Sequence, residues 1–243
     1  MLLSPTFPRR NAVVGPRAPA SRCPGEGHGQ PPDPFALERE RMVADQIADR
    51  GVHDAAVLRA MRAVPRHLFV PPEDRSSAYE DSPLPIGHGQ TISQPYIVAL
   101  MTELAAPRPG DIVLEIGTGC GYQAAVLAHL VRHVYSIELV EDLAKEAAAR
   151  LASLGYENAT VRAGDGRKGW PEHAPFDIIL AAAAPEAVPP ALVEQLRPGG
   201  RLIIPSGPLH RQELLKIVKD DAGRTTREVA AAVRFVPMLG EGQ

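Results

Sequence analysis

A short apolar run that leads into an acidic residue and alternating glycines is the feature of this sequence best suited to binding a ligand. Residues 113–121 read VLEIGTGCG. Glycine tolerates positive φ angles and lets a ligand approach the main chain closely. After the first strand of a doubly wound sheet, such a loop lies where nucleotides bind. We therefore predict a nucleotide-type ligand beside Gly117 and Gly119, with Cys120 contributing its main chain rather than a nucleophilic thiol.

The spacing of the glycines separates two classes of cofactor. A dinucleotide fingerprint, Gly-x-Gly-x-x-Gly, would place its third glycine at position 122, but Tyr122 stands there and the third glycine is Gly121. The start of the predicted helix therefore lacks the glycine that would admit a pyrophosphate. Glu115 suits a zwitterionic ligand instead, because its carboxylate can balance the amino group of a methionine moiety, directly or through water.

Two more acidic residues end strand-like runs further along the chain. Glu138 closes the run HVYSIE about 20 positions after Gly117, where a carboxylate can accept both hydroxyls of a ribose. Asp165, in the sequence AGDG, follows the next run and can accept from an adenine amino group. Taken singly, the three motifs also fit a tight strand-to-helix turn, a solvated strand end and a turn-forming Asp. Their order favours a cofactor site.

The elements that must position these residues alternate between strand-like and helical patterns. We predict strands at 112–116, 133–137, 159–163, 176–182 and 201–204, and helices at 96–105, 122–131, 141–154 and 190–196. Such alternation is typical of parallel βαβ units. The runs 213–219 and 228–236, joined by a turn at 220–224, predict an antiparallel hairpin. The fold class is therefore α/β, a doubly wound and mostly parallel sheet with a C-terminal antiparallel hairpin.

The N-terminal part of the chain divides into three stretches. Residues 1–34 are rich in Pro, Gly and Arg and predict a disordered extension, or a start codon assigned too far upstream of Met42. A single domain is expected over 35–243. It should begin with a helix at 35–50 that ends at Gly51, and a second helix through Ala63 capped by Asp54. The turn-rich stretch 65–95 is expected to be an ordered, functional loop, because structureless loops of that length are uncommon in compact domains.

Composition excludes several classes of function. The net charge of −3 and the pI near 6.2 argue against a general nucleic-acid binder. Cys23 and Cys120 stand in unrelated contexts, and His67, His173 and His210 lack ligand spacing, so we expect neither a disulfide nor a metal site. No apolar run approaches the ~18 residues of a membrane span. A cytoplasmic monomer that binds neither nucleic acid nor membrane is expected.

Several segments together resemble a known family. They are AYEDSPLPIG at 78–87, GQTISQP at 89–95, GDG at 164–166, PGGRLIIP at 198–205 and VRFVP at 233–237. With VLEIGTGCG, they resemble the class I methyltransferases that use S-adenosylmethionine (AdoMet) on a Rossmann-like sheet. Within these, they resemble the protein-L-isoaspartate O-methyltransferases, from about Met42 to Leu239. Cys120 replaces a frequent Ser, and LAAAA at 180–184 lacks a hydroxyl residue often found there.

The resemblance implies a reaction and a set of site residues. The methyl group of AdoMet would pass to the free α-carboxylate of an L-isoaspartyl residue in a protein or peptide. The ester would then collapse to a succinimide that hydrolyses partly to normal Asp. Residues 35–95 would bind the substrate, with the loop 79–90 forming part of the peptide cleft. The implied catalytic residue is Ser93, and the implied cofactor contacts are Thr91, Ile92, Glu115, Gly117, Gly119, Cys120, Glu138, Leu139, Asp165 and Gly166.

The chemistry agrees with that assignment. An α-carboxyl group with a pKa near 3.5 is already ionised at neutral pH, so it needs no general base. Ser93 would orient the carboxylate, since no triad is present to activate its hydroxyl; it also suits the N-cap of the following helix. Three alternatives stay open: an AdoMet methyltransferase for a small molecule or a nucleic acid, a nicotinamide-dependent dehydrogenase, and a non-catalytic AdoMet-binding module. The second is opposed by Tyr122, and base methylation by the sequence AAAPE at 182–186.

Overall fold

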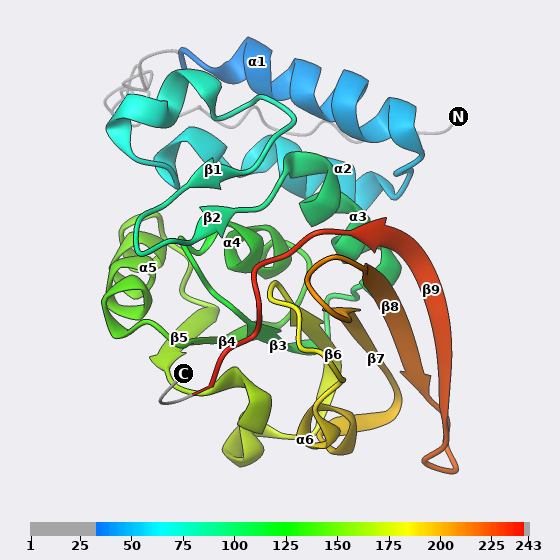
Figure 1. The fold of residues 1–243 in the computed structure, drawn as a ribbon. Helices are drawn as coiled ribbons and strands as arrows, with labels where there is room; N and C mark the ends of the chain where they lie inside the picture. The colour runs from blue at the N-terminus through cyan, green and yellow to red at the C-terminus, as the bar shows by residue number, and fades with distance from the viewer. Residues whose placement is uncertain (1–32, 241–243) are drawn as a thin grey trace, which may run out of the picture. The chain divides into compact units, whose positions relative to one another are not determined.

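A seven-stranded sheet forms the centre of the domain (Figure 1). The computed structural model describes residues 33–240, so our expectation for residues 1–34 lies almost wholly outside the described residues. Along the sheet the strands run in the order β5 (Ala159–Ala163), β4 (His133–Glu138), β3 (Ile112–Ile116), β6 (Phe176–Ala181), β7 (Leu196–Ser206), β8 (Gln212–Lys219) and β9 (Thr225–Val233). The first five are parallel, whereas β8 and β9 are antiparallel to their neighbours. The predicted fold class is confirmed.

The strand order creates a crevice beside β3. The chain proceeds from β3 outward through β4 to β5, and then returns to the other side of β3 as β6. The loops that follow β3 and β6 therefore leave the sheet in opposite directions. In doubly wound folds, ligands bind at this point of divergence, outside the carboxyl ends of the strands.

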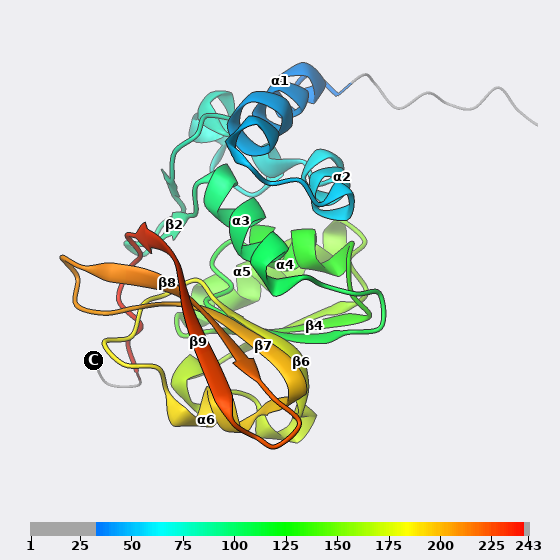
Figure 2. The ribbon, with the colours of Figure 1, turned by 90° about the vertical axis from the view of Figure 1, so that its right-hand side faces the viewer.

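Helices cover both faces of the sheet. Figure 2 shows α3 (Pro95–Ala105), α4 (Tyr122–Ala128) and α5 (Glu141–Ser153) on one face and α6 (Pro190–Glu194) on the other. Alternate strand residues enter separate cores: Val113 packs with the first set of helices, and Leu114 packs on the opposite side. Because both faces are buried, the strands read as continuous apolar runs.

A helical layer precedes the sheet. The single helix expected at 35–50 consists of three helical types in succession: α1 (Ala36–Arg41), a π-helical segment η1 (Met42–Ile47) and a 3₁₀ turn η2 (Ala48–Arg50). It ends, as predicted, at Gly51 with φ 97°. The helix α2 (Ala55–Ala63) follows, and the Asp54 carboxylate accepts from the main-chain N–H of Ala56 at 2.7 Å. The predicted cap is confirmed.

The stretch 65–95 is ordered, as expected. It contains the 3₁₀ turns η3 (Arg66–Leu68) and η4 (Pro72–Ser77), and a two-stranded antiparallel ribbon of β1 (Leu84–Pro85) and β2 (Thr91–Ile92). We call residues 78–93, which include this ribbon, the acceptor segment. Buried Tyr79 and Ile86 anchor it to the domain.

Several predicted boundaries were wrong. The helix α4 ends at Ala128 rather than 131, and α6 ends at Glu194 rather than 196. The strand expected at 201–204 is the longer β7, which already pairs with β6 at Leu196. The Pro-Gly-Gly sequence lies within β7, where the pairing register shifts. The strand expected at 228–236 is β9, which pairs with β8 from Thr225 and ends at Val233. In the part of the chain that the structure describes, no helix is long and apolar enough to span a membrane.

Candidate functional site

The glycine loop opens directly from the buried strand β3. Gly117 has φ 89° and Gly119 has φ 53°, conformations that a residue with a Cβ atom adopts at a cost. The N–H of Gly117 donates to the carbonyl of Ile137 on the neighbouring strand at 2.8 Å. A Cβ at Gly119 would lie 3.1 Å from Cδ1 of Ile86, so the acceptor segment packs closely on this loop. The loop thus presents main chain, not side chains, to the crevice.

Glu138, at the end of β4, holds the glycine loop in place. Its Oε2 accepts from the N–H of Gly119 at 2.7 Å, and its Oε1 accepts from the N–H of Val140 at 3.1 Å. Glu138 as a whole is 6% exposed. An ionised carboxylate has about four acceptor positions, so two remain for other donors. Glu138 meets the glycine loop because β3 and β4 are adjacent parallel strands. The expected contact of Glu138 with the ribose hydroxyls stays a prediction.

Glu115 lies inside the sheet, beneath the glycine loop. Its carboxyl is fully buried and accepts from the Ser136 hydroxyl at 2.5 Å, and Ser136 in turn lies 2.5 Å from the Thr118 hydroxyl. Oε1 of Glu115 has no hydrogen-bond partner in the structure. Burial raises the pKa of Glu115 to about 8, although the Ser136 hydrogen bond opposes the shift. The side chain does not line the crevice, so any effect on a ligand passes through the hydroxyls or through water.

Asp165 follows β5 and is engaged by its own neighbour. Its Oδ2 accepts from Nη2 of Arg167 at 2.8 Å, and its Oδ1 accepts from the main-chain N–H of the same residue at 2.9 Å. The next residue, Gly166, lines the crevice, whereas Asp165 does not. The expected adenine contact of Asp165 stays a prediction.

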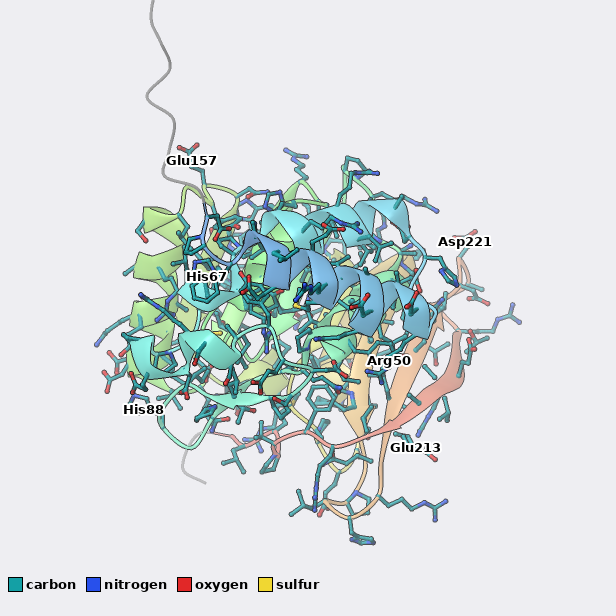
Figure 3. The ribbon with its side chains drawn as sticks, turned by 90° about the horizontal axis from the view of Figure 1, so that it is seen from above. Arg50, His67, His88, Glu157, Glu213 and Asp221 are labelled. Carbon is teal, nitrogen blue, oxygen red and sulfur yellow. The ribbon has the colours of Figure 1, made fainter. Side chains whose placement is uncertain are left out.

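The crevice beside these residues is a cleft of about 410 Å³, which we call the donor cleft. Among the predicted residues, it brings together Thr91, Gly117, Gly119, Glu138, Leu139 and Gly166. It also includes His88 and Gln90 from the acceptor segment, Ala182 and Ala183 after β6, and residues 236–239. In Figure 3, His88 lies at the outer end of the acceptor segment, well apart from Glu213 of β8.

A second cleft, of about 780 Å³, adjoins the first, and we call it the acceptor cleft. Ser93 and Gln94 line it, together with Pro83 and residues 232–237. Thr91 and Ala182 line both clefts. Thr91 and Ala182 thus form the junction of the two clefts, and Ser93 lines the acceptor cleft next to it, between β2 and α3. It makes no side-chain cap to α3, so the N-cap interpretation of Ser93 is wrong.

Ile92 and Cys120 lie behind this junction rather than in the donor cleft. Both line a small void of about 40 Å³ that Ser93 and Gly117 also touch. Cys120 is 4% exposed, and burial raises the pKa of its thiol, which keeps it protonated and poorly nucleophilic. Its carbonyl accepts from Arg150 at 2.9 Å. In this structure the main chain of Cys120 therefore contacts Arg150 of the protein, rather than the donor cleft.

The segment after β9 is the part of the site that sequence reasoning missed. Figure 1 shows this segment leaving the hairpin and running back past β6 toward the C-terminus. Ala184 donates to the carbonyl of Val236 and accepts from the N–H of Met238, both at 2.8 Å. Val236 and Pro237 consequently line both clefts. The only signal in the sequence was VRFVP at 233–237, which we used for the family resemblance and not for the site.

The described residues contain no group of three His, Cys, Asp or Glu side chains that could hold a metal ion. Two adjoining clefts share one wall, a carboxylate lines the smaller, and a serine lines the larger next to that wall. This arrangement suits the transfer of a group between two bound molecules.

Comparison with known sequences points to one family of methyltransferases. The family model described as protein-L-isoaspartate(D-aspartate) O-methyltransferase matches residues 37–243. A protein-L-isoaspartate O-methyltransferase of Opitutus terrae is 58% identical over 204 residues, which cover 84% of this chain and 88% of that protein. A protein of the same name from a Synechococcus species is 54% identical over 233 residues, which cover 90% and 95%.

Solved structures agree with the sequence matches. A protein-L-isoaspartate O-methyltransferase superimposes with a TM-score of 0.75 at 32% identity, over 83% of this chain and 66% of that one. A Plasmodium falciparum structure in complex with S-adenosyl-L-homocysteine gives a TM-score of 0.72 at 24% identity, over 83% and 98%. The second likeness concerns the fold alone.

Proposed function

Because this chain belongs to the protein-L-isoaspartate(D-aspartate) O-methyltransferase family, we propose that its two clefts divide the family reaction between them. The enzyme transfers a methyl group from AdoMet to the free α-carboxylate of L-isoaspartyl residues in damaged proteins and peptides, which starts their repair through a succinimide. In our proposal the donor cleft holds AdoMet and the acceptor cleft holds the isoaspartyl residue. The observation that carries this division is the wall that the clefts share at Thr91 and Ala182.

The donor cleft fits AdoMet in size and in chemistry. Its volume falls within the roughly 300–1,000 Å³ usual for small-molecule sites. A Cβ at Gly166 would lie 2.2 Å from Cγ2 of Ile116, so this position leaves no room for a larger side chain. The carboxylate of Glu138 faces the cleft with acceptor capacity to spare, and the orphaned oxygen of Glu115 lies beneath the glycine loop. Bound there, AdoMet supplies a methyl group on a positively charged sulfur.

In this proposal the protein groups bind and orient rather than react. Glu138 accepts from the ribose hydroxyls, and the main chain at Gly117 and Gly119 accommodates the methionine end. Leu139 and Gly166 form walls of the cleft, with Thr91 and Ile92 close to the transferred group. Cys120, Asp165 and Glu115 act from outside the cleft lining. The first two shape the adjacent loops, and Glu115 holds the Ser136 hydroxyl beneath the glycine loop.

Ser93 is proposed to hold the acceptor carboxylate. The carboxylate is the nucleophile, so the contribution of the site is alignment and the exclusion of water. A hydroxyl in the acceptor cleft, next to the wall shared with the donor cleft, can donate one hydrogen bond to a carboxylate oxygen and leave the other oxygen free to react. Val236 and Pro237, which line both clefts, support this role by forming part of the wall beside Ser93.

We further propose that the enzyme acts as a cytoplasmic monomer on protein and peptide substrates, without a part for nucleic acid or membrane. The net charge of −3 supports the exclusion of nucleic acid. A single catalytic domain over 35–243, preceded by an extension, is supported by the family model, which matches residues 37–243.

The test of the proposed function is a comparison of two acceptors. An isoaspartyl peptide and its matched normal Asp peptide are offered with methyl-labelled AdoMet. The isoaspartyl peptide should be labelled at least a hundredfold faster, because the two carboxylates differ in position by about 1 Å. The label should leave as methanol in mild base, as a carboxyl ester requires. Equal labelling of the two peptides, or a base-stable label, would contradict the proposal.

A further inference from the structure

Arg66 is the largest fully buried side chain of the described domain, and it has no acidic partner there. Its side chain is 0% exposed, and no carboxylate among residues 33–240 forms an ion pair with it. Burial lowers the pKa of its guanidinium, although arginine keeps its charge in proteins. A buried charge without a counter-ion costs several kcal/mol, so its position should serve a purpose beyond packing.

The Arg66 guanidinium links the two ends of the acceptor segment by hydrogen bonds. Its Nε donates to the carbonyl of Ala78 at 2.7 Å, and its Nη2 donates to the carbonyl of Ser93 at 2.8 Å. These two carbonyls mark the ends of the segment that carries the β1–β2 ribbon. The planar fork of Arg66 therefore fixes the main chain of Ser93 itself, not only a neighbour of it.

The same group also contacts the donor side of the site. It lies over the ring of Tyr122, with 4.9 Å between Cζ and the ring centroid. Tyr122 is 1% exposed and begins α4, immediately after the glycine loop. Arg66 thus touches both the main chain of Ser93 and the first residue after the glycine loop.

We propose that Arg66 is a positioning residue, which sets the distance between Ser93 and the donor cleft and thereby the alignment of the acceptor carboxylate. The inference rests on the role proposed above for Ser93. Alignment within a few tenths of an ångström is what the reaction needs, and a displacement near 1 Å costs about a hundredfold in rate. Lysine cannot reproduce the link, because its single ammonium lacks the fork that reaches two carbonyls at once.

The test uses the full chain and two substitutions. Arg66→Lys keeps the charge but loses the fork. Arg66→Met keeps the volume and removes the buried charge, which favours folding even if Arg66→Lys fails. We expect kcat for an isoaspartyl peptide to fall roughly tenfold to a hundredfold in both. The KM for the peptide and the Kd for AdoMet, measured by calorimetry, should stay within about threefold.

Arg201→Lys is the matched control. Arg201 is also largely buried, but it pairs with Asp111 at 3.0 Å, at the end of β3 away from the site. Its substitution should lower the melting temperature without lowering kcat at a temperature well below the melting transition. A kcat within twofold of wild type in Arg66→Met would overturn the inference, and so would a rise in the AdoMet Kd that matches the fall in kcat.

A double-mutant cycle with Ser93→Ala tests the positioning role of Arg66 separately from the proposed role of Ser93. If Arg66 acts through Ser93, the loss caused by Arg66→Met should shrink severalfold when Ser93 is already alanine. If the fold losses in kcat of Arg66→Met and Ser93→Ala instead multiply in full in the double variant, the positioning role of Arg66 is contradicted. The proposed role of Ser93 would then remain intact. An unchanged kcat in Ser93→Ala alone would contradict the proposed role of Ser93.

Discussion

Among the residues of the site, Glu115 is held in the least water-like surroundings. The folded protein raises its pKa from 4.5 to about 8, chiefly by burial. Between these two pH values the folded state binds a proton that the unfolded state has lost, so the free energy of unfolding falls as the pH rises from about 4.5 to about 8. At 1.36 kcal/mol per pH unit, the free energy of unfolding should differ by roughly 5 kcal/mol between the two pH values.

Glu115→Gln should remove this dependence. We expect the variant to be more stable than wild type at pH 8.5 by several kcal/mol, with the two proteins converging near pH 4.5. Urea unfolding at a series of pH values measures the difference. Glu157→Gln, at an exposed position, should follow wild type throughout. A wild-type slope retained in Glu115→Gln would show that Glu115 does not carry the proton.

Glu138 gives a prediction about the cofactor. Glu138→Ala should weaken AdoMet binding by about 1.5–3 kcal/mol, the range for hydrogen bonds to a charged group. It also removes the acceptor for the Gly119 N–H, so the glycine loop should become more mobile. Calorimetry with Glu146→Ala, an exposed glutamate of α5, as control measures the effect. Equal dissociation constants for the two variants would exclude Glu138 from the site.

At the scale of elements, the N-cap of α2 is the most local prediction to test. Asp54→Ala removes the acceptor for the N–H groups of Ala56 and Val57, which should lower the free energy of unfolding by about 0.5–2 kcal/mol. Asp54→Asn keeps a capping oxygen and should cost much less. Chemical unfolding of both variants distinguishes a capping loss from a loss of charge, since both lose the charge.

The elements divide into those that local pattern determines and those that pairing determines. The strand β3 and the cap at Asp54 follow from apolar runs and side-chain chemistry, and Glu138 meets the glycine loop because neighbouring parallel strands end at the same edge. The π-helical segment η1 and the early start of β7 do not follow from local pattern. Each depends on what it packs against: η1 buries Met42, Val43 and Ile47, and β7 pairs with β6 through a Pro-Gly-Gly sequence that alone indicates a turn.

The same distinction applies to the site. The glycine loop, Glu138 and Ser93 were identified from residue types and from the family motifs. The wall formed by residues 236–239 was not, because its path depends on how the β8–β9 hairpin directs the chain back to Ala184. Arg66 was missed because a lone arginine beside a proline carries no sequence signal, and only its burial distinguishes it.

At the scale of the whole molecule, the wall after β9 joins distant parts of the chain. A truncation after Phe235 removes it and keeps the hydrogen bond from the Phe235 N–H to Gln212 that anchors the hairpin. We expect the Kd for AdoMet and the KM for the peptide both to rise at least about tenfold, since residues 236–237 line both clefts. Calorimetry and steady-state kinetics measure the two constants. An unchanged Kd for AdoMet would show that the wall has no part in the donor cleft.

The ion pair of Asp165 bears on how the enzyme itself ages. Isomerisation begins when the main-chain nitrogen of the next residue attacks the side-chain carbonyl of Asp, and a following glycine hinders that attack least. The chain has one Asp-Gly sequence, Asp165-Gly166, and no Asn-Gly. The Asp165 side chain is 3% exposed and is fixed by Arg167. The folded repair enzyme therefore shields its most susceptible bond from the damage that it corrects in other proteins, and loses that shield when it unfolds.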